Sequence, residues 1–389
     1  MLLCDLWNVQ TDELTEIKTS GHSVERVSRQ ATASNATEEK KISFDGALVF
    51  PGLINAHDHL DFNLYPMLGK GNYSSYVEWG NDIHQTHKEV INKVLEIPKD
   101  LRIQWGIYKN LLNGVTTVVN HGEHIETNGD LIDVFQDCNV LHSPQFEQGW
   151  KYKLNKPFAG KQPYVIHVGE GRDVAAWEEI NDIIKWNVFG RKIIGVHGIA
   201  MDTVQARSFE ALVWCPYSNY FLVGKTADVE KLKHNTNILF GTDSTISASW
   251  NLWEHLKMAR KENALTCAEL FKSLTELPAK VWKLEGKGSI AQGNDADIVV
   301  ARRKNGHSAL QAFFDVQPED ILMVMHKGNI RLFDSSLLQQ LSDQGTDAAA
   351  YSKVMVNDSM KYVAGSLHLL IEKIRQYYHD VVIPVNIAD

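Results

Sequence analysis

Two histidines separated by one residue, His57 and His59, form the strongest chemical signal in the sequence. They end a short apolar run that begins at Leu53, and such a run predicts a buried β-strand. Residues two apart on a strand point to the same face, so both imidazoles can face one ion while Asp58 turns away. Neutral imidazole is a good ligand for Zn²⁺ and Fe²⁺. Taken alone, the pair is equally consistent with polar residues at a strand end.

Three further apolar runs end in side chains that can bind a metal. His167 ends the run from Tyr164, His197 ends the run from Ile193, and Asp243 follows the run from Ile238. In parallel α/β barrels, the carboxyl ends of the strands carry the active site. A single such residue is usually structural, but four strands with the same feature indicate a metal site at one end of a barrel.

The elements that must position these residues alternate between strand and helix patterns after Pro51. This alternation predicts a parallel α/β architecture, and the length suits a (β/α) barrel over 51–286. Seven strands can be recognised, and between Gln145 and Tyr164 no strand–helix unit is evident, so we expect distortion around the third and fourth strands. The predicted strands are Leu53–His57, Thr116–Asn120, Val140–Gln145, Tyr164–His167, Lys192–His197, Ala211–Cys215 and Ile238–Gly241.

Both ends of the chain show strand-like patterns outside this barrel. Residues 1–50 and 287–335 are expected to form one composite β-sandwich domain, with the polar stretch Gly21–Lys41 as a loop or a weakly ordered hairpin tip. Residues 336–389 are expected to form a helical extension, because apolar residues from Val356 to Tyr377 follow a 4-3 spacing. We expect this helix to dock on its own barrel; the alternative is a contact in a homo-oligomer.

Composition excludes several classes of protein. The formal net charge is −9 over 389 residues, which argues against a nucleic-acid-binding protein. The four cysteines form no CxxC pair, so neither a disulfide framework nor a zinc ribbon is expected. The N-terminus does not resemble a secretory signal, and no apolar run is long enough to cross a bilayer, so a cytoplasmic location without membrane partners is expected.

Several motifs resemble those of the amidohydrolase superfamily, in its branch of deaminases and triazine chlorohydrolases. The resemblance covers the chain from about Phe50 to Phe333. It rests on the order of six motifs: PGLINAHDH at 51–59, GVTTV at 114–118, HVGE at 167–170, CPYSN at 215–219, GTDS at 241–244 and GSIAQGNDADIVV at 288–300. It implies a (β/α)8 TIM-type barrel and a hydrolase acting on C–N bonds other than peptide bonds.

The resemblance also implies a role for each residue of the predicted site. His57, His59, His167 and Asp243 would bind one divalent ion, Zn²⁺ or Fe²⁺, which activates a water molecule near neutral pH. Asp243 and His197 would hold or deprotonate this water. Glu170, the last residue of the HVGE motif, would carry the proton to the leaving group, a task suited to a carboxyl whose pKa is raised by burial.

A binuclear site is the main alternative within the superfamily. It uses a carboxylated lysine at the end of the fourth strand, whereas Lys151, Lys153, Lys156 and Lys161 all lie in a polar stretch. Together with the HVGE motif, this favours a single metal ion.

Residues that contact the substrate are harder to predict. The candidates are His121, which follows the second strand, Trp150, an aromatic residue that could line the site or pack in a core, and Asn219, the last residue of the CPYSN motif; His124 and His142 are expected to be structural. The loop Asp61–Trp79 contains five aromatic residues. It is either a lid that stacks on a heterocycle or a small core of its own.

These features predict a deaminase that attacks a C–N bond of a small cyclic or heteroaromatic compound. The alternatives with the same site are a cyclic amide or imidazolone hydrolase and a dechlorinase. A catalytically silent scaffold protein is disfavoured, because such proteins usually lose metal ligands and every expected ligand is present.

Overall fold

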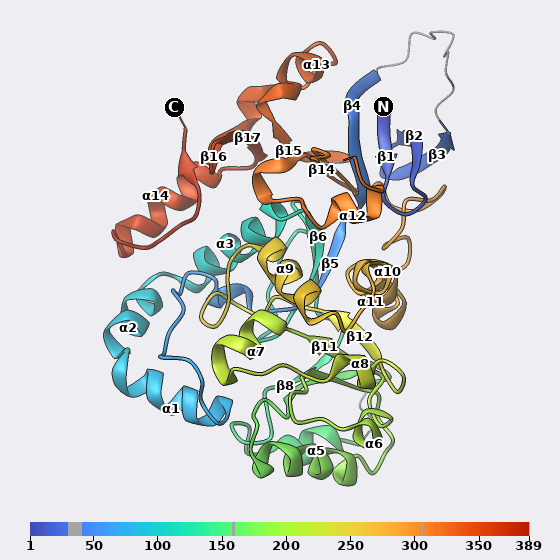
Figure 1. Ribbon diagram of the computed structural model, residues 1–389. Coiled ribbons are helices and arrows are strands. Elements are labelled where there is room, and N and C mark those ends of the chain that lie inside the picture. The colour runs from blue at the N-terminus through green and yellow to red at the C-terminus, as the bar shows by residue number, and fades with distance from the viewer. Residues whose placement is uncertain (30–40, 158–159, 305, 389) are drawn as a thin grey trace.

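The computed structural model describes residues 1–29, 41–157, 160–304 and 306–388. Strands from both ends of the chain lie at the top of Figure 1, and the α/β part that carries the predicted ligands lies below them. Both termini of the chain lie in the upper part.

The upper part is built on one ten-stranded sheet whose strands come from both ends of the chain. β4 pairs with the parallel β1 on one side and with the antiparallel β13 on the other, which joins the two ends. The pairing of the chain ends is thus observed, whereas the division into separate domains stays a prediction. The strands are β1 (Leu2–Asn8), β2 (Glu13–Ser20), β3 (Ser23–Arg29), β4 (Lys41–Pro51), β13 (Ile298–Ala301), β14 (Ile321–His326), β15 (Asn329–Asp334), β16 (Tyr351–Val356), β17 (Ser359–Ala364) and β18 (Asn386–Ile387).

The prediction for the polar stretch Gly21–Lys41 holds in part. Gly21 and His22 form a hairpin tip between the paired strands β2 and β3, residues 23–29 are β3 itself, and residues 30–40 lie outside the described ranges. The prediction that residues 336–389 form a helical extension was wrong, since residues 351–364 form β16 and β17 around a turn at Asn357, where φ is 51°. The 4-3 spacing of apolar residues arose from two strands and a helix in succession, which hydrophobic spacing alone does not separate.

The C-terminal helix itself is shorter than predicted. α14 spans Leu367–Tyr377 and packs against α3 (Lys99–Leu112). Its apolar side belongs to the main hydrophobic core through Leu367, Leu370 and Ile374. The helix therefore docks on its own chain as expected, and a role in a homo-oligomer stays a prediction.

The lower part contains two parallel sheets, ordered β5-β6-β7 and β12-β11-β10-β9-β8. The amides of Thr242 and Asp243 donate to the His57 carbonyl at 3.2 and 3.0 Å, which ties the end of β12 to β5. The parallel α/β architecture is confirmed, and closure into a barrel stays a prediction. The strands are β5 (Leu53–Asp58), β6 (Val115–Asn120), β7 (Asp133–Phe135), β8 (Asn139–Leu141), β9 (Tyr164–Val168), β10 (Ile193–His197), β11 (Ala211–Trp214) and β12 (Asn237–Phe240).

The irregular part of the α/β arrangement lies earlier than the predicted gap. β7 was missed by the sequence analysis because it is only three residues long and half-buried. β7 pairs with β6, and β8, which begins after a three-residue interruption, pairs with β9. The segment 133–141 therefore leaves one sheet and joins the other. Between Gln145 and Tyr164, the described residues contain the short helix α4 (Trp150–Leu154) and no strand.

Helices follow most strands of the lower part. The capping box predicted at Thr266 and Glu269 is confirmed: each side chain accepts a hydrogen bond from the other residue's amide, at the start of α10. Besides α3, α4 and α14, the α-helices of the described residues are α1 (Tyr76–Thr86), α2 (Lys88–Glu96), α5 (Val174–Trp186), α6 (Thr203–Ala206), α7 (Pro216–Val223), α8 (Val229–Leu232), α9 (Leu252–Glu262), α10 (Cys267–Lys272) and α11 (Glu276–Trp282), and, in the upper part, α12 (Ala309–Phe313) and α13 (Leu338–Ser342).

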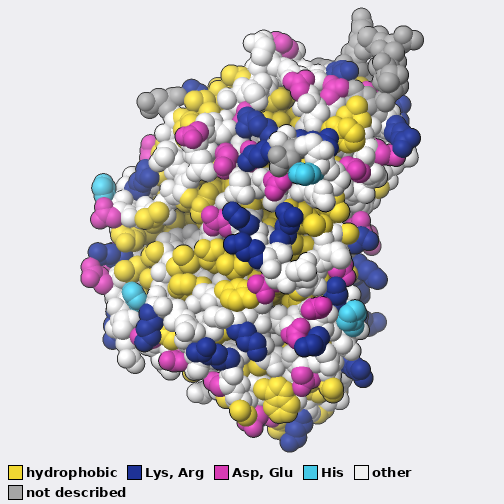
Figure 2. Space-filling view, in the orientation of Figure 1, with side chains coloured by type: hydrophobic (Ala, Val, Ile, Leu, Met, Phe, Trp, Pro, Cys, Tyr) yellow, Lys and Arg dark blue, Asp and Glu magenta, His cyan; other side chains and the backbone are white. Residues whose placement is uncertain are grey.

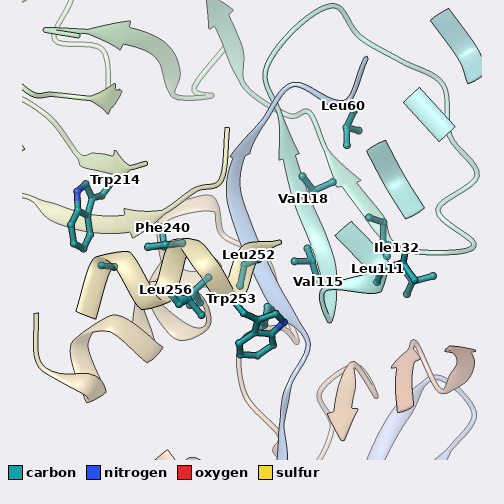
Figure 3. Packing of buried hydrophobic residues seen from close by; sticks show 14 of the residues in the cluster. Leu60, Leu111, Val115, Val118, Ile132, Trp214, Phe240, Leu252, Trp253 and Leu256 are labelled. Atoms are coloured by element: carbon teal, nitrogen blue, oxygen red, sulfur yellow. The ribbon is translucent and has the colours of Figure 1, made fainter. Parts of the chain in front are cut away.

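The main core is continuous between the two parts. Figure 3 shows α9 residues packed beside Phe240 of β12 and near β6. Trp253 of α9 also meets Phe50 of β4 edge-on, with ring centroids 6.1 Å apart. Burial of such large side chains is the main source of stability, roughly 1.5–3 kcal/mol each.

The surface is mixed, with Lys and Arg interspersed among Asp and Glu over the face in Figure 2. None of the helices in the described ranges has the length and hydropathy to span a bilayer.

A buried ion cluster centred on Asp297 links the two parts. Asp297 lies 2.7 Å from Lys287 Nζ and accepts hydrogen bonds from His326 Nδ1 at 2.9 Å and from Thr116 of β6 at 3.1 Å. Burial acts to raise the pKa of Asp297, but the hydrogen bonds and charges of His326 and Lys287 outweigh it and lower the pKa to about 2. The folded state therefore favours the ionised carboxylate.

Asp297→Asn is expected to lower the free energy of unfolding at pH 7 by about 3 kcal/mol, because it leaves the buried Lys287 without part of its counter-charge. Because the folded pKa lies below the usual value near 4, the carboxylate stabilises the protein above about pH 4, and this stabilisation is lost as pH falls toward 2. Urea unfolding at pH 7 and pH 3 checks this. An equal difference between the two proteins at both pH values would contradict it.

Candidate metal and active site

Three imidazoles and one carboxylate converge at the carboxyl ends of β5, β9 and β12. His167 Nε2 lies 3.2 Å from both His57 Nε2 and His59 Nε2. Asp243 Oδ1 lies 4.0 Å from His57 Nε2 and 3.8 Å from His59 Nε2. Ligands that share one zinc at about 2.0–2.2 Å lie roughly 3–4 Å from one another. The side chains predicted from the sequence are therefore brought together in an arrangement that fits one divalent ion.

The electrostatics of these histidines suit metal binding. His57 and His167 are buried, and burial followed by the charges of neighbouring histidines lowers the pKa of both well below the usual value. Both imidazoles are therefore neutral at pH 7, the form that coordinates a metal. Burial acts to raise the pKa of Asp243, but the charges of His59 and His197 and hydrogen bonds lower it overall, so its carboxylate is ionised.

Hydrogen bonds orient each side chain of the cluster. His167 Nδ1 donates to the His142 carbonyl at 2.7 Å, which leaves Nε2 to face the other ligands. Asp243 Oδ2 accepts hydrogen bonds from Ser218 at 2.8 Å and Ser247 at 2.9 Å, which leaves Oδ1 on the side of the histidines. His197 Nδ1 is 2.8 Å from Asn219 Oδ1. The CPYSN motif thus supplies the groups that orient Asp243 and His197.

Backbone strain is concentrated at two of these residues. His197 and Asp243 have φ values of 69° and 58°, in the left-handed region that residues with a side chain rarely adopt. Such conformations cost of order 1–3 kcal/mol and persist at positions that the surrounding structure fixes. Here they turn both side chains toward the histidine cluster at the ends of β10 and β12.

Glu170 lies beside His197, with 3.5 Å between Glu170 Oε1 and His197 Nε2. Burial, then the charges of Asp243 and Glu179, raise the pKa of Glu170 well above its usual value. Burial also lowers the pKa of His197. A carboxyl with a raised pKa beside an imidazole is a pair suited to proton transfer, and the predicted role of Glu170 as a proton carrier stays a prediction.

A cavity of about 420 Å³ opens onto this cluster. Its volume suits a small molecule, and its wall is largely aromatic and aliphatic. Four of the five aromatic residues predicted in the loop after β5 face it, whereas Tyr73 instead hydrogen-bonds Asp82 through its hydroxyl. The lining residues include His59, Phe62, Tyr65, Tyr76, Trp79, Ile83, His84, Ile91, Leu95, His142, Phe146, His167, Glu170, His197, Leu222, Asp243, Ser244, Ile246 and Ser247.

The three predicted substrate contacts do not line this cavity. Trp150 is part of the main hydrophobic core, and Asn219 is buried behind His197. His121 lies against the ligand histidines, with its ring centroid 4.3 Å from that of His167. His142, which was expected to be structural, does face the cavity. Sequence position did not predict these directions, because tertiary packing decides them: Trp150 begins α4 and Asn219 lies within α7.

Two buried charged residues near the site were missed by the sequence analysis. Lys109 of α3 lies 3.0 Å from Asp58 Oδ2 and donates to the Asp243 carbonyl at 3.3 Å. Glu179 of α5 accepts a hydrogen bond from the Gly169 amide at 2.7 Å, and Gly169 lies between His167 and Glu170. Both residues lie on helices, and the sequence of each helix does not indicate that these charged side chains are buried against partners elsewhere in the chain. Burial, together with the charge of Asp173, raises the pKa of Glu179 to about 7 against opposing hydrogen bonds.

Glu179→Ala is expected to reduce turnover roughly 10- to 100-fold while metal content stays near that of the unmodified protein, because Glu179 acts by holding the turn that carries Glu170. Glu179→Gln, whose amide oxygen can still accept the Gly169 hydrogen bond, should restore most of the lost turnover. Glu178→Ala, at the exposed neighbouring position, is the matched control. Equal losses in the Ala and Gln variants would contradict a positioning role.

Comparison with known proteins supports the resemblance seen in the sequence. The Amidohydrolase family model matches residues 168–331. No curated protein matches the chain. Among solved structures, the chain is similar to a zinc-bound adenosine deaminase from Xanthomonas campestris, with 16% identity, a TM-score of 0.71 and coverage of 97% of this chain and 99% of that chain.

Two further solved structures share this fold. A 5-methylcytosine deaminase from Klebsiella pneumoniae, liganded with 5-fluorocytosine, has 17% identity, a TM-score of 0.64 and coverage of 85% of this chain and 97% of that chain. An atrazine chlorohydrolase from Arthrobacter aurescens, complexed with zinc, has 14% identity, a TM-score of 0.64 and coverage of 88% and 98%. The matched segment contains the strands that lead to His197 and Asp243, and over this segment the chain is similar to the Amidohydrolase family.

Proposed function

We propose that this protein is a mononuclear metal-dependent hydrolase that removes an amino group from a small cyclic or heteroaromatic compound. The observation that carries the proposal is the convergence of the three imidazole nitrogens and the Asp243 oxygen beside the buried carboxyl of Glu170. The family match and the zinc-bound structural neighbours support this assignment.

His57, His59, His167 and Asp243 would hold the ion, which is Zn²⁺ or Fe²⁺ because nitrogen ligands with one carboxylate suit both. When bound, such an ion is a Lewis acid that makes water a nucleophile at neutral pH. A single ion is favoured because β8 contains no lysine that could bridge two ions.

The chain's own side chains direct the proton transfers. Asp243 is an ionised carboxylate, and His197 presents a neutral Nε2 toward Glu170, so both can accept or hold a proton of the attacking water. The raised pKa of Glu170 favours its protonated form, which can deliver a proton to the departing amino group, and this group then leaves as ammonia. The enclosed position of all three excludes bulk water from this transfer.

The cavity wall supports a flat apolar substrate with a few polar substituents. Phe62, Tyr65 and Trp79 supply aromatic faces on which a heterocycle can stack. His84 and Ser247 lie on the same wall and can hydrogen-bond ring substituents. A small molecule is therefore the proposed partner of this site.

Ammonia release from a panel of amino-substituted purines, pyrimidines, pterins and triazines tests the proposal. At least one member is expected to release ammonia with the metal-loaded protein, and at least about 100-fold more slowly with Glu170→Gln. Product analysis separates the alternatives, since dechlorination releases chloride and ring opening of a cyclic amide releases no ammonia. Absence of hydrolysis across all these substrate classes would overturn the proposal.

A further inference from the structure

One histidine beside the proposed metal site has no role in the function described above. His121 follows β6 directly, and its backbone amide donates to the Asp58 carbonyl at 2.8 Å. Its side chain is 2% exposed, and neither of its ring nitrogens has a hydrogen-bond partner in the described structure. A buried polar atom without a partner costs roughly 1–3 kcal/mol, so an orphaned imidazole requires an explanation.

The position of the His121 ring matches that of the ligand histidines. Its centroid lies 4.3, 5.0 and 5.2 Å from those of His167, His57 and His59. The three ligand rings are themselves separated by 4.9 to 5.2 Å. One ring nitrogen of His121 lies within 4.8 Å of ligand nitrogens of His57 and His167. The four rings thus surround one point at similar spacing, as imidazoles that share an ion do.

Two neighbouring histidines that are not proposed as ligands differ from His121 in their hydrogen bonds and in their place on the cavity wall. His142 Nδ1 is 3.2 Å from Ser143 Oγ, and the His142 ring faces the cavity. His197 Nδ1 pairs with Asn219, and its Nε2 lies near Glu170. His121 has neither such a partner nor a place on the cavity wall. Substrate contact therefore does not account for it.

We propose that His121 is a fifth protein donor to the metal centre, in addition to the three histidines and Asp243. The inference rests on the metal site of the proposed function and extends its ligand set. A ring nitrogen of His121 that has no hydrogen-bond partner is available to donate a lone pair to an ion. Four imidazoles and a carboxylate would bind the ion more tightly than the four-residue set, and His121 contributes without narrowing the substrate cavity.

Measurements of metal affinity and of the ligand field around the ion test directly whether His121 is a donor. We would compare the full-length protein with His121→Leu, which preserves volume but has no donor, and with His121→Gln, which retains an oxygen donor. The metal is removed with a chelator, and the Zn²⁺ Kd is then measured by competition with a chromophoric chelator. The visible spectrum of the Co²⁺-loaded protein reports the donor set independently of activity.

His121→Leu is expected to weaken Zn²⁺ binding by about 100-fold or more and to change the Co²⁺ spectrum, with His121→Gln intermediate. Its metal-free Tm should be unchanged or higher, because the change removes two unpaired buried nitrogens. The matched control is His142→Gln. The His142 ring also lies beside His167, with ring centroids 5.4 Å apart, but among the described residues His142 does not belong to a group of side chains that could hold a metal ion, so this change should leave the Zn²⁺ Kd unchanged.

Unchanged Kd and an unchanged Co²⁺ spectrum in both His121 variants would overturn the inference, as would an equal loss of affinity in His142→Gln. If His121→Leu fails to fold, the His121→Gln comparison alone decides between these results. Tight metal binding by the unmodified protein together with unaffected variants would refute only the role of His121. No metal binding by the unmodified protein would instead refute the proposed function.

Discussion

His167→Ala is expected to abolish metal binding and hydrolysis together. His167 Nε2 lies 3.2 Å from the Nε2 atoms of both His57 and His59, so it is close to both other histidines of the predicted donor set. Loss of an outer-shell partner typically weakens metal binding 10- to 100-fold, and loss of a ligand itself should exceed about 100-fold. Metal content by mass spectrometry and turnover, measured on the same preparation, check this.

The folding of the His167→Ala protein must be established separately. The change removes a buried ring and is expected to lower Tm by a few degrees, so circular dichroism at the assay temperature is required. His234→Ala, at an exposed position, is the matched control. A folded His167→Ala protein that retains a full complement of metal would exclude His167 from the ligand set.

Glu170→Gln is expected to separate metal binding from catalysis. The amide preserves the size of the side chain but has no acidic proton to transfer, and general acid–base catalysis contributes typically 10²–10⁴-fold to rate. Glu170 is not among the side chains that converge on the ion site, so metal content should be unchanged. Turnover is therefore expected to fall by about three orders of magnitude while the metal remains bound.

Glu178→Gln provides the control for this substitution. Glu178 is exposed on α5 next to the buried Glu179, so its loss of charge changes nothing in the cavity. Near-normal turnover by Glu170→Gln would remove Glu170 from its role as proton carrier. A parallel loss of metal and turnover would show that Glu170 supports the ligands instead.

The convergence of the proposed ligands could be predicted from the sequence because each of them lies at or just after the end of a short apolar run. His57 lies in β5 and His59 directly follows it, and His167 and Asp243 lie at or after the ends of runs that form β9 and β12. Parallel strands place their carboxyl ends together, so the convergence follows from the order of motifs alone. The distances of 3.2 to 4.0 Å between ligand atoms confirm this part of the prediction.

The surroundings of the site could not be predicted in this way. Lys109 and Glu179 act through partners about 50 and 10 residues away in sequence, and the direction of each side chain depends on tertiary packing. His121 shows the same limit, because its place after β6 suggested the cavity while the fold turns it toward the ligands. Hydrophobic spacing also failed where short elements follow one another, as at β7 and at β16 and β17.

The dependence of ammonia release on bound metal tests the central claim most directly. The substrate found in the panel would be assayed with the purified protein, with the same protein after complete chelation, and after Zn²⁺ or Fe²⁺ is added back. Ammonia release is expected to disappear with the metal and to return when about one ion per chain is restored. Undiminished ammonia release from protein shown to contain no metal would contradict the assignment of His57, His59, His167 and Asp243 as a catalytic metal site.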